Sequence, residues 1–229
     1  MTAGPLLLAC ALSAERVALR PVARAVARAD GAPGGDGPGP GPEVRLLCTG
    51  MGPQRSGRSV RAELTTRQLP YGALAFVGFG AAVRPGVRPG DVLVADEVED
   101  ADGTAGATSG VKSLVDALER AGCTVHTGPL YSADRVVRGD ARSALSERGV
   151  LGVDMETAAA LRAARNLRPE LPVAALRVVV DTPERELLRP ATLTGGLRAW
   201  RVLRRLGPAL GAWYRDPHPL PSPLLERPS

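Results

Sequence analysis

The chain has 229 residues and a formal net charge of +5, and aromatic residues make up only 3% of it. That length suits one large α/β domain whose core is built from alanine, valine and leucine. The positive charge comes almost entirely from scattered arginines, without a basic patch interleaved with aromatics, which argues against nucleic-acid binding. Three widely spaced cysteines and two isolated histidines argue against a disulfide framework and against a metal site.

Short apolar runs alternate with helical patterns along the chain. In chain order, we expect strands at residues 6–12, 44–48, 73–79, 91–97, 124–131, 150–153 and 173–180, and helices at 14–28, 54–68, 109–121, 156–165 and 192–213. Residues 134–148 form a loop or a helix, and the Gly- and Pro-rich residues 30–42 predict a flexible loop. The alternation predicts an α/β fold, a three-layer α/β/α sandwich around a mixed, mainly parallel sheet. We expect one domain over residues 1–215 and an irregular Pro-rich tail at 216–229.

The two ends of the chain bear on its location. The apolar run at 5–12 is too short to cross a bilayer and has no basic flank before it, so we expect a cytoplasmic protein. The last expected helix, 192–213, interleaves arginines with leucines and tryptophans. Such a helix covers the sheet with its arginines in solvent, or it makes a peripheral contact with an anionic membrane.

Acidic residues stand at the exits of three expected strands. Glu15 follows the first strand, Glu156 follows residues 152–155, and Asp181 ends the apolar run at 178–180. Because strand ends converge at one edge of an α/β sheet, these carboxylates can line one pocket. Each alone is more typical of a helix start or a turn, and only the three together favour a catalytic site.

Five segments carry a resemblance to a known family. Residues 152–159, Gly-Val-Asp-Met-Glu-Thr-Ala-Ala, resemble the ribose-binding signature of the purine nucleoside phosphorylase and nucleosidase superfamily. Residues 11–15 and 177–181 are similar to two strand exits of its methylthioadenosine/S-adenosylhomocysteine nucleosidase branch, and 78–92 resembles its glycine turn and following strand. Residues 180–196 resemble the hopanoid-cluster (HpnG-type) nucleoside phosphorylases, which are thought to release adenine from adenosylhopane.

The resemblance implies cleavage of the bond between a ribose and a purine. Asp181 would protonate the leaving base, and Glu15 would activate a water. Met155 would pack against the ribose, and Glu156 would accept hydrogen bonds from its 2′- and 3′-hydroxyls. The resemblance further implies a homodimer.

Three further positions bear on the base and the nucleophile. Val137 would offer backbone groups to the base edge, and Gly80 lies in the turn that meets the nucleophile. Val136 stands where the nucleosidases carry a phenylalanine under the base. This departure leaves the identity of the base less defined than the sugar site.

Hydrolysis and phosphorolysis both stay open. The glycine-rich turn before residues 54–68 offers backbone N–H groups at a helix start, so Gly52 and Arg55 are candidate phosphate ligands. An ordinary strand-to-helix turn explains them equally well, and Glu15 favours water because a carboxylate repels phosphate. We expect no cofactor other than phosphate as a co-substrate. The alternatives are a methylthioadenosine/S-adenosylhomocysteine or futalosine-type nucleosidase, a nucleoside-binding protein without turnover, and a membrane-associated partner in a lipid pathway.

Overall fold

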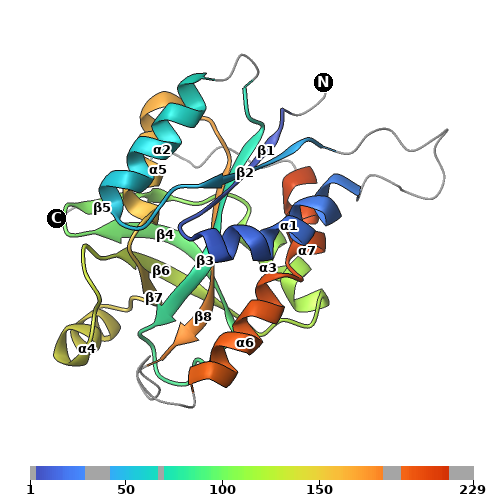
Figure 1. Cartoon of the computed structure of the whole chain (residues 1–229). Coiled ribbons are helices and arrows are strands. Elements are labelled where there is room, and N and C mark those ends of the chain that lie inside the picture. Colours follow the sequence, from blue (N-terminus) through green and yellow to red (C-terminus); the bar gives the residue numbers. More distant parts are fainter. Residues whose placement is uncertain (1–3, 29–41, 67–69, 183–191, 217–229) are drawn as a thin grey trace.

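The computed structural model describes residues 4–28, 42–66, 70–182 and 192–216 (Figure 1). Nearly all of the expected loop at 30–42 and of the expected tail at 216–229 lies outside these residues. Within the described ranges, none of the helices combines the length and the apolar character that crossing a membrane requires.

An eight-stranded mixed sheet forms the centre of the molecule. Its strands are β1 (Leu6–Cys10), β2 (Val44–Cys48), β3 (Ala73–Ala82), β4 (Val92–Asp100), β5 (Gly103–Ala107), β6 (Val125–Ser132), β7 (Gly152–Asp154) and β8 (Val173–Asp181). The order is β2-β1-β3-β7-β6-β4-β5, and β8 pairs with both β3 and β4, so that five strands close into a ring. Among the strand pairs of the described residues, β3–β7, β4–β5 and β4–β8 are antiparallel and the others are parallel. The predicted mixed, mainly parallel α/β fold is confirmed.

Seven helices lie in the described residues and cover the sheet on two sides (Figure 1). They are α1 (Ser13–Arg28), α2 (Pro53–Thr66), α3 (Val111–Arg120), α4 (Gly139–Glu147), α5 (Thr157–Leu167), α6 (Thr192–Leu203) and α7 (Gly207–Arg215). On one side α2 packs on α5, and on the other side α7 packs on α1 and α3. The strand β1 is apolar throughout because Leu6 and Leu8 face the second group of helices, whereas Leu7 and Ala9 face the first.

The structure corrects the sequence predictions in two places. The strand β5 was not predicted, because Gly103–Ala107 lacks both β-branched alternation and large apolar residues, and it forms by pairing with β4. The single helix expected at 192–213 is two helices, α6 and α7. A Cβ on Gly207 would lie 2.6 Å from the Ala25 Cβ, so α7 begins where its backbone closely approaches α1.

The apolar face of α6 and α7 is part of the core. Leu203, Leu210 and Trp213 are fully buried, and the Trp213 indole donates a hydrogen bond to the Ser109 carbonyl at 2.9 Å. Arg201 and Arg204 are exposed. The buried side chains of this segment therefore pack against the sheet and its neighbouring helices, as the first interpretation of the helix expects, and a membrane contact stays a prediction.

Candidate active site

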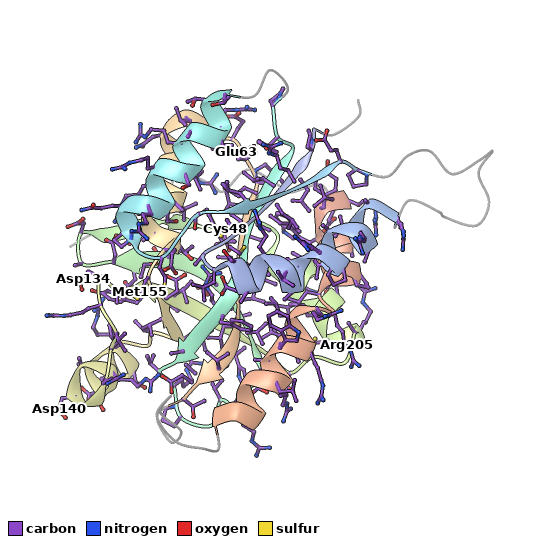
Figure 2. The ribbon with its side chains drawn as sticks, in the orientation of Figure 1. Cys48, Glu63, Asp134, Asp140, Met155 and Arg205 are labelled. Atoms are coloured by element: carbon purple, nitrogen blue, oxygen red, sulfur yellow. The ribbon has the colours of Figure 1, made fainter. Side chains whose placement is uncertain are left out.

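A cavity of about 180 Å³ lies beside the ends of β1, β3, β7 and β8. Its lining is largely apolar, and it includes five of the site residues expected from the sequence: Glu15, Gly80, Val137, Met155 and Asp181. Figure 2 labels Met155 at this place and Asp134 on the neighbouring loop, which follows β6. The convergence of strand ends thus places residues from distant parts of the sequence in one pocket.

Backbone N–H groups from the exit of β1 and from within β3 hold Glu15. Its Oε2 accepts hydrogen bonds from the Ala11 and Leu12 N–H groups at 3.0 and 2.8 Å, and its Oε1 accepts one from the Phe79 N–H at 2.6 Å. A Cβ on Gly78 would lie 2.6 Å from Oε1, so this approach requires a glycine. The carboxylate is 2% exposed and lines the cavity, an arrangement that fixes the orientation of a base.

A buried ion pair between Arg177 and Asp154 lies at the wall of the cavity. The Arg177 Nε and Nη2 donate to Asp154 Oδ2 at 2.9 and 2.6 Å, and the side chains of Ser132 and Thr157 donate to the same carboxylate. Burial acts to raise the pKa of Asp154, but Arg177 and these hydroxyls outweigh it and hold that pKa below its ordinary value. Burial likewise opposes the charge on Arg177, but its carboxylate neighbours raise its pKa.

The sequence analysis assigned no role to Arg177 or Asp154. The sequence signal for Asp154 was its position three residues before Thr157, at the start of an expected helix, where an aspartate commonly accepts a backbone hydrogen bond. In the structure its Oδ1 accepts one from the Thr157 N–H at 3.3 Å. Gly80 lines the cavity, and a Cβ there would lie 2.8 Å from the Arg177 Cβ. Its lack of a side chain therefore makes room for the ion pair.

Glu156 adjoins the cavity without lining it. The Gly52 N–H donates to its Oε1 at 3.0 Å, and the Met155 N–H donates to its Oε2 at 3.2 Å. Burial, with a smaller contribution from the Asp154 charge, raises the pKa of Glu156. These bonds tie the turn before α2 to the start of α5 and leave Met155 facing the cavity.

The structure does not bring the two candidate phosphate ligands to the cavity. The Gly52 N–H is engaged by the Glu156 carboxylate, and neither Gly52 nor Arg55 lines the cavity. The Arg55 side chain is exposed and lies over Gly50. An anion at this turn would have to displace a buried carboxylate from its backbone donor.

Asp181 has a partner that the sequence analysis did not predict. The Arg142 Nη2 donates to Asp181 Oδ2 at 2.9 Å, and the two side chains are 4% and 9% exposed. Arg142 belongs to α4, in the segment for which loop and helix were both open. A weak signal was present, because Arg142 and the buried Leu145 are three residues apart and share one face of that helix.

A family model described as the phosphorylase superfamily matches residues 39–195. The chain belongs to the phosphorylase superfamily. A search of the curated proteins found no match. The expectation of an enzyme from this superfamily is confirmed by the family match, and the site therefore belongs to a superfamily enzyme.

Solved structures share the superfamily fold over nearly their whole length. A 5′-methylthioadenosine/S-adenosylhomocysteine nucleosidase from Helicobacter pylori aligns with a TM-score of 0.70 at 14% identity, covering 93% of this chain and 98% of that chain. Futalosine hydrolase from the same organism aligns at 0.68 and 14%, covering 92% and 97%. The nucleosidase from Neisseria meningitidis, in complex with methylthio-immucillin-A, aligns at 0.66 and 19%, covering 91% and 97%. At these identities the similarity concerns the fold.

Proposed function

We propose that this protein cleaves the N-ribosidic bond of a purine nucleoside by hydrolysis. The observation that carries the proposal is a single apolar cavity containing both Glu15, held by three backbone N–H groups, and Asp181. A base that activates water and an acid that protonates the leaving group are the pair that glycosidic cleavage requires. Membership in the phosphorylase superfamily supports the cleavage of an N-ribosidic bond.

In this mechanism the ribose lies against Met155. The neighbouring Glu156 accepts hydrogen bonds from the ribose hydroxyls at the acceptor sites that its bonds to the Gly52 and Met155 N–H groups leave open. As the bond from C1′ to the purine nitrogen breaks, its electron pair moves into the base, and Asp181 donates a proton to a ring nitrogen. The sugar becomes oxocarbenium-like, as in glycoside hydrolysis. A water that passes a proton to Glu15 then adds to C1′. The backbone of Val137 offers hydrogen-bonding groups to the base edge.

Water is favoured over phosphate as the nucleophile. The Glu15 carboxylate would repel a phosphate dianion placed beside C1′. The glycine turn that could cradle an anion donates its Gly52 N–H to Glu156 instead. We therefore expect base release that does not depend on phosphate.

For the substrate we propose adenosylhopane, with methylthioadenosine, S-adenosylhomocysteine and futalosine as the alternatives. The HpnG-type resemblance of residues 180–196 supports this choice, although 183–191 lies outside the described residues. The exposed side chains of Leu12, Met51 and Val136 line the cavity at its rim. An apolar rim suits a hydrocarbon group on the ribose 5′ carbon. We also propose the homodimer that the resemblance implies, which light scattering of the purified chain would test.

Chromatography of free base released from each of these four nucleosides, with and without phosphate, tests the proposal. We expect adenine from adenosylhopane at the same rate in both buffers, and a large loss of rate in Glu15→Gln. A strict phosphate requirement would replace hydrolysis by phosphorolysis. Tight binding of a nucleoside analogue without release of any base would instead establish a binding protein.

A further inference from the structure

The ion pair between Arg142 and Asp181 has no role in the chemistry described so far. The Arg142 guanidinium makes one hydrogen bond through Nη2, to Asp181 Oδ2. Its Nε and Nη1 are buried and have no hydrogen-bond partner among the described residues. By contrast, all three side-chain nitrogens of the buried Arg177 donate hydrogen bonds.

Stability alone does not account for Arg142. A buried guanidinium with two unsatisfied nitrogens carries a desolvation cost that one ion pair rarely offsets. Arg142 shares its buried helix face with Leu145, and an apolar residue could fill the position without that cost. A buried cation with two unsatisfied nitrogens, in contact with an acid that lines the cavity, calls for a functional explanation.

We propose that Arg142 is the positioning residue of the general acid and stabilises the Asp181 carboxylate that remains after the proton passes to the purine. The inference rests on the proposed function, in which C1′ loses the base and Asp181 loses a proton in the same step. The negative charge then develops 2.9 Å from Arg142 Nη2, in a site largely closed to water. A preorganised cation at the place where charge develops lowers the barrier more than it would in water.

The contact between Arg142 and Asp181 also acts in the free enzyme, because a neighbouring cation favours the ionised form of the Asp181 carboxyl. The other charged side chains that line the cavity are Glu15, Asp154 and Arg135. Asp140 and Glu147 lie with Arg142 along an adjacent depression on α4. The Asp154 charge is matched by Arg177. Removal of Arg142 should therefore let Asp181 keep its proton to higher pH and lower the rate at the optimum.

The test compares Arg142→Met and Arg142→Lys with wild type and with Arg61→Met, an exposed arginine on α2 that serves as the matched control. Two substrates are used across a range of pH. One is a purine nucleoside that wild type cleaves, and the other is 4-nitrophenyl β-D-riboside, whose leaving group departs as an anion without a proton. Thermal unfolding of each variant reports on folding.

For the purine nucleoside, we expect Arg142→Met to lower kcat about 10²-fold and to move the high-pH fall of activity upward by about one unit or more. Arg142→Lys should keep the wild-type pH dependence, because it retains the charge. The nitrophenyl riboside should lose far less rate in Arg142→Met than the purine nucleoside does. Arg61→Met should match wild type on both substrates.

Equal losses on the two substrates, or an unchanged pH dependence in Arg142→Met, would overturn the inference and leave the proposed function intact. If Arg142→Met does not fold, Arg142→Gln carries the same comparison. Failure of wild type to release base from any purine nucleoside would overturn the proposed function and this inference with it.

Discussion

Gly78→Ala would place a methyl group where the Glu15 carboxylate now lies. The new Cβ would be 2.6 Å from Oε1 and 2.9 Å from Cδ, closer than van der Waals contact allows, so Glu15 would have to move. The hydrogen bond from the Phe79 N–H is the first to be lost. A hydrogen bond to a charged group contributes about 1.5–3 kcal/mol, and we expect the variant to lose stability by that amount. Displacement of the base should also lower kcat about 10²-fold or more.

The assay combines urea denaturation with base release. Gly196→Ala is the matched control, because a Cβ at Gly196 meets no atom within 4 Å and alanine favours the helix α6. If the clash is with Glu15, Gly78→Ala should cost less stability in a Glu15→Ala background than in wild type. Wild-type turnover in Gly78→Ala, or the same stability cost in both backgrounds, would refute this account of the glycine.

Three further predictions concern buried groups. Asp181→Asn should abolish most base release and, because Arg142 loses its counter-charge, lower the free energy of unfolding by about 3 kcal/mol, measured by urea titration. The pKa of Asp154 is held below its ordinary value of 3.8, so this carboxylate contributes to the free energy of unfolding above pH 3.8, and the contribution is lost as the pH falls through the lowered pKa. In Asp154→Asn, the free energy of unfolding should depend less on pH in this acidic range. Trp213→Ala should lower the free energy of unfolding by about 3–5 kcal/mol, because the side chain is fully buried, and thermal unfolding measures this loss. A negligible loss would contradict the placement of α7 in the core.

Local patterns in the sequence were sufficient to predict most of the elements. The apolar run at 6–12 forms β1 at Leu6–Cys10, and the run at 173–180, which only Arg177 interrupts, forms β8 at Val173–Asp181. Both strands are buried on both faces, which requires apolar residues on both. The same order of elements placed Glu15 and Asp181 at strand exits, and strand exits meet at one edge of the sheet. Five of the expected site residues therefore line one cavity.

Only the tertiary structure decided how these residues are supported. Arg142 and Asp181 are 39 residues apart in the chain, and no local periodicity links an arginine of α4 to the end of β8. From the sequence alone, the Gly52 N–H could donate equally well to a bound phosphate. In the folded chain it donates to the Glu156 carboxylate, which comes from a distant segment. Helix and strand periods are set by the backbone of neighbouring residues, whereas the partners of a buried charge are set by which distant segments pack together.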